Sequence, residues 1–272
     1  TIGSQLWNSS LSGDLGGTPL VNGERIYVPN GQAIYCLNIT NGNLLWNVSS
    51  EWGYFHELAL HNGVLIAPCA WDKLFMFDAM TGTEIQPTSN MYQASSYYAP
   101  AIDGNTIYVS SEHGYGANEN LWIAVVEYVN GNYSYTGSIL EISGVTNNSN
   151  ALISAPILWN NYLWVNTING LVRYDLATNT YITPVANAVG KPVVGGDYLY
   201  ILTSDNHIKG VNATGSVVKD ITVSGNVGST LAINNDNTVL YTVNANGNIY
   251  RASVNANSAD KIYHVNPVSS AF

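Results

Sequence analysis

Three segments of the sequence gather aromatic rings, carboxylates and histidines, the side chains that most often bind polar ligands or move protons. These segments are 51–57, 91–98 and 112–120, and Trp71 and Asp72 lie between the first two. Aromatic rings stack on flat or apolar groups, and carboxylates accept hydrogen bonds from hydroxyl groups. The candidate ligand-binding residues are Trp52, Tyr54, His56, Glu57, Trp71, Asp72, Tyr97, Tyr98, Glu112, His113 and Tyr115.

Two adjacent pairs in this set, His56 with Glu57 and Glu112 with His113, have the residue types of acid–base catalysis. The sequence shows no nucleophile with a recognisable base and orienting group, no phosphate-binding loop and no zinc-type spacing. We therefore expect binding, with no catalytic residue, metal or cofactor. An enzyme that acts on polysaccharides as a hydrolase or lyase, with its site on the same segments, is the alternative.

A second alternative concerns the aromatic residues themselves. The chain contains 19 tyrosines, so tyrosines fall in many loops by chance, and Trp52 and Trp71 could simply pack between neighbouring sheets. The two interpretations differ in one observable property. A ligand-binding ring must be exposed, whereas a packing ring must be buried.

The element that would position these segments is seen most clearly in Thr18–Trp46. It reads TPLVNGERIYVPNGQAIYCLNITNGNLLW, in which three Asn-Gly pairs separate four short runs of apolar residues. Asn-Gly is the preferred pair for tight hairpin turns, because both central residues of a type I′ turn need positive φ. The segment is predicted to be a four-stranded antiparallel meander, with its third strand at Ala33–Asn38.

The meander recurs along the whole chain. Its frame, Pro-x3-Gly-x3-Tyr, begins at Pro19 and returns at Pro100, Pro156 and Pro192, with weaker copies at Ala59 and Leu231. Sheets repeated at this period bury their faces against one another, which predicts one all-β domain over 1–272, a β-propeller of four-stranded antiparallel blades. The six predicted blades span about 18–50, 55–89, 98–142, 152–185, 189–224 and 228–266. In a meander, the loops that enter the innermost strand and those that join the second and third strands lie on the same face. The segments 51–57 and 91–98, and 112–120 as a long loop between the second and third strands, are therefore expected to share one face of the second and third blades. Residues 1–10, with Trp7, are predicted to be a closing outer strand, and a seventh blade assembled from the chain ends is the alternative to six.

The repeat resembles that of the pyrroloquinoline-quinone (PQQ)-like β-propellers, which typically ends Tyr-Ala-Leu-Asp-x-x-Thr-Gly-x-x-x-Trp. Residues 75–82, FMFDAMTG, are the closest copy, and 173–179, RYDLATN, are a degenerate one. The resemblance implies the architecture. It also implies that a quinone dehydrogenase of this family would have adjacent disulfide-bonded cysteines, a Trp beneath the quinone and a calcium site. Adjacent cysteines are absent from this sequence, which argues against quinone chemistry.

Composition favours a place outside the cytoplasm. Only 10% of the residues are charged, against roughly 25% in an average soluble domain. This composition resembles that of surface proteins from thermoacidophilic archaea. The chain starts at Thr1, so we expect any secretion signal or anchor to be removed or to lie outside this sequence. Six sequons are candidate glycosylation sites: Asn8, Asn38, Asn47, Asn132, Asn147 and Asn212.

The net charge and the length of the apolar runs limit the classes of partner that the chain could bind. A net charge of −10 argues against nucleic acid, which needs a basic patch. Apolar runs stay below the roughly 18–20 residues of a membrane-spanning helix. We therefore expect a non-catalytic extracellular or cell-surface scaffold whose partner is a protein or a glycan.

The two cysteines, Cys36 and Cys69, leave two interpretations open. They fall in neighbouring predicted blades, so an oxidising compartment would allow a disulfide. Alternatively, each is a small buried apolar side chain. The sequence does not give the separation that would decide between them.

Overall fold

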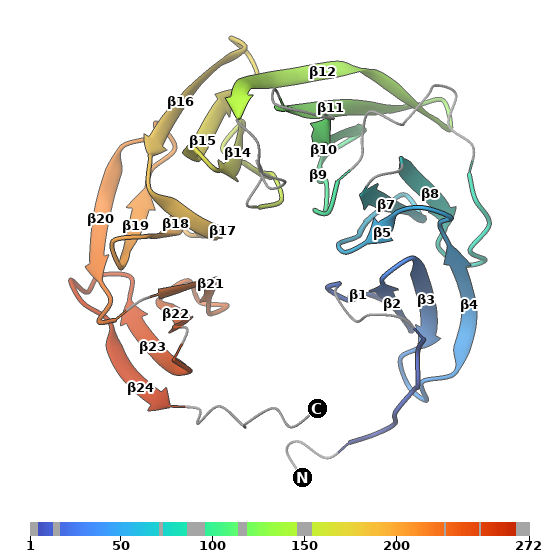
Figure 1. Cartoon of the computed structure of the whole chain (residues 1–272), viewed down its shortest axis with the longest axis horizontal. Coiled ribbons are helices and arrows are strands. Elements are labelled where there is room, and N and C mark those ends of the chain that lie inside the picture. The colour runs from blue at the N-terminus through green and yellow to red at the C-terminus, as the bar shows by residue number, and fades with distance from the viewer. Residues whose placement is uncertain are drawn as a thin grey trace. The chain divides into compact units, whose positions relative to one another are not determined.

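The computed structural model describes residues 5–12, 17–70, 73–85, 96–113, 119–145, 154–225, 227–244 and 246–264. All regular elements in these ranges are β-strands (Figure 1). They fall into two compact units, Thr1–Asn147 and Asn148–Phe272. Each unit contains three sheets, named A to F in chain order. The single domain expected from the sequence stays a prediction.

The first unit contains sheets A, B and C. Sheet A is a meander in the order β1-β2-β3-β4. In sheet B, β5 and β6 both pair with β7, and β8 pairs with the opposite edge of β7. Sheet C is a meander from β9 to β12, with register shifts between its two long outer strands. The strands are β1 (Leu20–Asn22), β2 (Arg25–Asn30), β3 (Ala33–Asn38), β4 (Leu44–Ser49), β5 (Tyr54–Phe55), β6 (Ala59–His61), β7 (Val64–Ala70), β8 (Leu74–Asp78), β9 (Ala101–Asp103), β10 (Thr106–His113), β11 (Glu119–Val129) and β12 (Asn132–Val145).

The second unit contains sheets D, E and F, and each is a four-stranded antiparallel meander. The inner strands of E and F, β17 and β21, carry register shifts where they pair with the second strand. The strands are β13 (Ile157–Trp159), β14 (Tyr162–Thr167), β15 (Gly170–Asp175), β16 (Thr180–Val185), β17 (Ala188–Gly195), β18 (Tyr198–Thr203), β19 (His207–Val211), β20 (Val217–Thr222), β21 (Val227–Ile233), β22 (Val239–Asn244), β23 (Asn248–Ser253) and β24 (Asp260–His264).

The core lies between neighbouring sheets of one unit and is built on the second and third strands. Tyr27, at the repeated aromatic position of sheet A, is fully buried with Phe55 and Phe77 of sheet B. Trp164 has the same position in sheet D and packs with the inner strands of sheet E. The repeated aromatic of the sequence frame is thus a packing residue.

One sequence expectation about sheet C was wrong. The segment Glu112–Asn120 was predicted to be a long loop, but Glu112 and His113 lie in β10 and Glu119 and Asn120 lie in β11. The ladder pairs Glu112 with Leu121 and His113 with Asn120. Polar residues continue the strands here because backbone pairing does not depend on apolar side chains.

The turn that follows the third strand of a meander is held by an Asp or Asn side chain in sheets A and B. In sheet B, Asp78 Oδ1 accepts hydrogen bonds from Thr81 N and Oγ1 and from Met80 N. These bonds, with the positive charge of Arg25, hold the pKa of Asp78 below its usual value. In sheet A, Asn38 Oδ1 holds the equivalent turn by accepting hydrogen bonds from Thr40 N and Asn41 N.

Because sheet B has Asp78 where sheet A has Asn38, the stability of the turn in sheet B should depend on pH. A carboxyl with a depressed pKa stabilises the fold above the unfolded value of about 3.9, and that contribution is lost as the pH falls through the folded pKa. Asp78→Asn should keep the turn, as Asn38 does, and should lose less stability than the parent between about pH 4 and pH 2. Urea unfolding of both proteins at pH 7 and pH 3 tests this. Equal acid-induced losses would contradict it.

Candidate functional site

The loop that carries Trp52 is fixed at both ends. Ser50 Oγ donates to Gly53 O at 2.9 Å and accepts from Gly53 N at 2.7 Å. Ser50 N donates to Gln32 O, and Phe55 N donates to Gly31 O, both at 2.9 Å. These bonds join the loop to the β2–β3 turn of sheet A, as expected for loops that share one face. Phe55 is fully buried and anchors the C-terminal end of the loop in the core.

At the tip of this fixed loop, the Trp52 side chain is 75% exposed, and nearby Tyr54 is 37% exposed. Trp52 is therefore not packed between sheets, which removes that alternative for this residue. A fixed loop loses little conformational entropy when its exposed ring stacks on a ligand. Whether Trp52 binds a ligand stays a prediction.

Behind this loop, two of the predicted segments come together. The rings of His56 and Tyr97 meet edge to face with their centroids 4.9 Å apart. Glu57 Oε2 accepts a hydrogen bond from Ala99 N at 3.0 Å, and His56 O accepts one from Thr18 N at 2.9 Å. The segments that lead into the inner strands of sheets A, B and C are therefore joined side by side.

Of the remaining candidate residues, the structure describes the side-chain environment of Tyr98 alone. Tyr98 is half-buried beside Tyr97, and its backbone N–H donates to Ser96 Oγ at 3.0 Å. Trp71, Asp72 and Tyr115 lie outside the described residues, while Glu112 and His113 are placed only by their backbone in β10. The structure joins His56 and Glu57 to the segment of Tyr97 and Tyr98, while Trp52 and Tyr54 precede them on the same loop. We call these six residues the B/C face. Their ligand role remains untested.

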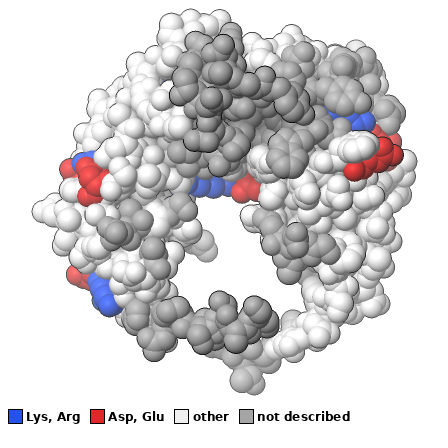
Figure 2. Space-filling view, viewed as in Figure 1, with Lys and Arg blue, Asp and Glu red and all other residues white. Residues whose placement is uncertain are grey.

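The chemistry available on the B/C face suits binding. Exposed rings stack, Glu51 is an exposed carboxylate, and the half-buried His56 and Glu57 are polar. Figure 2 shows few charged groups among the described residues on the visible side. Among the described residues, no group of three or more His, Cys, Asp or Glu side chains could hold a metal ion.

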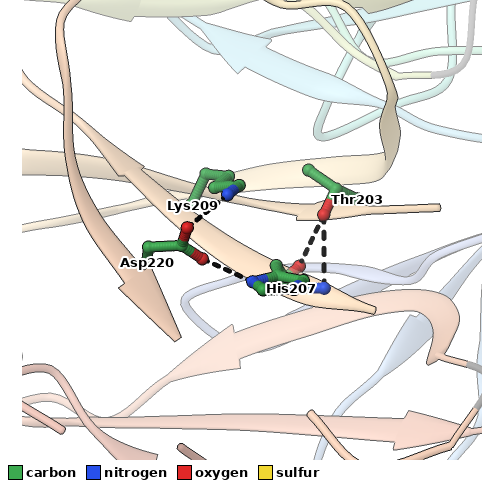
Figure 3. Close-up of polar contacts among 4 residues, drawn as sticks. All are labelled: Thr203, His207, Lys209 and Asp220. Carbon is green, nitrogen blue, oxygen red and sulfur yellow. Dashed lines mark hydrogen bonds and ion pairs between the residues drawn. The ribbon is translucent and has the colours of Figure 1, made fainter. Parts of the chain in front are cut away.

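A second polar cluster, which sequence reasoning missed, lies in sheet E (Figure 3). Asp220 on β20 contacts Lys209 Nζ at 2.6 Å and His207 Nδ1 at 2.5 Å, both on β19. The Lys209 hydrogen bond, followed by the His207 contact, holds the pKa of Asp220 below its usual value. Thr203 Oγ1 donates a hydrogen bond to His207 O and accepts one from His207 N. The cluster joins the outer strand β20 to β19 through side-chain contacts. The only feature of the sequence that pointed to it was the spacing of His207 and Lys209, which places both side chains on the same face of a strand.

The cysteine and sequon expectations are placed as follows. Cys36 and Cys69 are both buried, in the cluster between sheets A and B, and the disulfide considered above stays a prediction. Asn8, Asn47 and Asn132 are exposed, whereas Asn38 and Asn212 are half-buried and use their side-chain oxygens to hold turns. Asn147 lies outside the described residues.

Repeated four-stranded antiparallel sheets, with cores between neighbouring sheets, define a β-propeller. BamB from Moraxella catarrhalis has this fold, with a TM-score of 0.69 at 16% identity over 92% of this chain and 76% of that chain. The computationally designed Ika8 protein is also similar, with a TM-score of 0.55 at 14% identity over 94% of this chain and 89% of that chain. The fold is thus the predicted all-β propeller, and the residues that the structure describes form six four-stranded sheets.

The sequence comparison goes further than the fold. The family model described as outer membrane protein assembly factor BamB, one of the PQQ-like repeat families, matches residues 1–182. The chain belongs to this family, which confirms the resemblance of its repeats. No curated protein matches the sequence. None of the described residues forms a helix that is long and apolar enough to cross a membrane.

Proposed function

We propose that this protein is a non-catalytic, extracytoplasmic binding module that holds a protein or glycan partner on the B/C face. The observation that carries the proposal is Trp52, which is 75% exposed on a loop that four hydrogen bonds fix to its own base and to sheet A. Exposed Trp and Tyr side chains are favoured in binding sites because each gives a large contact area at a small cost in conformational entropy.

The family supports the choice of a protein partner. Its description, an outer membrane protein assembly factor, is that of a protein that helps others to assemble. A site made of exposed rings and carboxylates suits the binding of such a partner. A β-propeller is a rigid support for such a site, because residues on a fixed scaffold keep their geometry without a ligand.

The location also belongs to this proposal. The 10% charged content and the family description both support a place at the cell surface or between envelope layers. The low charge further supports the surface of a thermoacidophilic archaeon as one setting, because few cations would remain to repel one another at low pH. In such a compartment, exposed Asn8, Asn47 and Asn132 are the sequons that we propose for glycan attachment.

Two arrays test the function and its partner class together. Labelled protein is applied to an array of envelope glycans and to an array of peptides cut from envelope proteins. Each is run with the parent and with Tyr181→Ala, whose ring is 49% exposed on β16 of the other unit. The Trp52→Ala protein is applied in the same way. We expect one class of probe to bind the parent and Tyr181→Ala, and to bind Trp52→Ala weakly or not at all. A probe cleaved during the assay would instead support the polysaccharide hydrolase or lyase.

A further inference from the structure

The net negative charge of the chain lies entirely in its first unit. Thr1–Asn147 contains 12 of the 18 acidic residues but only two of the eight basic ones, whereas Asn148–Phe272 contains six of each. The first unit, which carries the B/C face, therefore accounts for the whole net charge of −10. A surface with this imbalance attracts positively charged groups and repels negative ones, so it favours a partner of complementary charge.

Both basic side chains of the first unit are already used within it. Lys73 Nζ forms an ion pair with Glu84 Oε1 at 3.0 Å and lies 4.6 Å from the centroid of the Phe75 ring. The Arg25 guanidinium donates to Cys36 Sγ at 3.6 Å. Each is therefore committed to a contact in the described part of this unit.

A carboxylate without such a contact lies next to the most exposed ring of the B/C face. Glu51 directly precedes Trp52 and is itself exposed. Its backbone is held, because Gln32 Nε2 donates to Glu51 O at 3.4 Å and Gln32 O accepts from Ser50 N at 2.9 Å. The Glu51 carboxylate makes no hydrogen bond or ion pair with any residue that the structure describes. An unpaired carboxylate and an exposed ring thus share one fixed loop.

We infer that the B/C face binds an arginine side chain of a basic polypeptide segment, an inference that rests on the function proposed above. The guanidinium lies over the Trp52 ring, and its N–H groups donate to the Glu51 carboxylate. Trp attracts cations more strongly than any other aromatic side chain. A planar guanidinium can stack on a ring and also match the geometry of a carboxylate, whereas an ammonium group is a compact point charge.

The charge of the first unit decides between the two partner classes. A neutral glycan gains nothing from this charge, and an acidic glycan or peptide is repelled by it. A basic polypeptide gains twice, since the field of the whole unit speeds its approach and the pair of Glu51 and Trp52 holds one of its side chains. The occupant of the B/C face is therefore a basic segment of a protein.

Two peptides that differ only in charge test the inference on the whole protein. One Gly/Ser peptide carries arginine at regular intervals, and the other carries citrulline, a neutral analogue of similar shape, at the same positions. We expect the parent to bind the citrulline peptide roughly tenfold more weakly, because an exposed cation–π contact and an exposed ion pair each contribute a factor of about two to five. Fluorescence anisotropy of the labelled peptides gives both Kd values. Equal Kd values overturn the inference.

Two glutamate variants separate the local contact from the charge of the unit. Glu51→Gln and Glu24→Gln each remove one negative charge from an exposed side chain of sheet A or its neighbouring loop, and Glu24 lies in the β1–β2 turn. We expect Glu51→Gln to weaken binding of the arginine peptide about threefold and to leave the citrulline peptide unaffected, while Glu24→Gln changes neither Kd appreciably. Equal effects of the two variants would mean that only the overall charge acts, which overturns the inference.

Trp52→Ala separates this inference from the function on which it rests. We expect this variant to bind the arginine peptide several-fold more weakly than the parent does. A neutral glycan that binds the parent and is lost with Trp52→Ala, while the arginine and citrulline peptides bind alike, overturns the inference but leaves the proposed function standing. Tight binding of the arginine peptide that Trp52→Ala does not weaken overturns both.

Discussion

Replacing Gly82 by Ala should lower the free energy of unfolding by roughly 2–4 kcal/mol. Gly82 has a φ of +74°, a conformation that costs a residue with a Cβ about 1–2 kcal/mol. The added Cβ would also lie 2.8 Å from the Trp46 ring, so the ring must move and its bond to Ala79 O must lengthen or break. Urea unfolding followed by circular dichroism measures the loss.

The matched control for this variant lies in the same sheet. Gly63 has a φ of +77°, but nothing lies within 4 Å of an added Cβ there. Gly63→Ala should therefore show only the conformational cost, about 1–2 kcal/mol. The difference between the two variants measures the contact of Trp46 with sheet B. Equal losses would mean that this contact contributes nothing to the packing of sheets A and B.

Replacing Trp52 by Ala should raise the Kd for the ligand found on the arrays about tenfold or more, which corresponds to about 1.4 kcal/mol. The ring is 75% exposed, so its removal creates no cavity and should leave the Tm close to that of the parent. Isothermal titration gives the Kd, and thermal unfolding confirms that the fold is intact.

Two further variants define what the Trp52 result means. Trp52→Phe keeps an aromatic ring and should recover part of the lost affinity, which a purely steric role would not require. Tyr181→Ala removes a ring that is also exposed but lies on β16 of the other unit, and it should bind as the parent does. If Trp52→Ala and Tyr181→Ala bind equally well, the B/C face is not the site.

Much of the strand pattern could be predicted because turns and alternation are local. The third strand expected at Ala33–Asn38 is β3, residue for residue, since Asn-Gly pairs limit it on both sides. The error at Glu112–Asn120 arose where pairing continues through polar residues, for which alternation of apolar side chains gives no signal. Backbone pairing at that end depends on the partner strand, which lies further along the chain.

The meeting of two candidate segments could be predicted from the sequence, but the geometry of the contact could not. The repeat frame placed 51–57 and 91–98 on one face, and the contact between His56 and Tyr97 agrees with that placement. The rigidity of the Trp52 loop could not be predicted, because it depends on bonds from Ser50 and Phe55 to the β2–β3 turn about twenty residues away. The cluster of His207, Lys209 and Asp220 was missed for a similar reason, since its members meet only when β19 and β20 pair.

Site-specific photo-cross-linking in the cells that make this protein tests the central proposal most directly. A photoreactive amino acid replaces Trp52 in one protein and Tyr181 in another, and adducts are identified by mass spectrometry after irradiation of intact cells. We expect position 52 to give an adduct with one envelope protein or glycoconjugate that position 181 does not give. The same adducts from both positions, or adducts from position 181 alone, would contradict a partner-binding role for the B/C face.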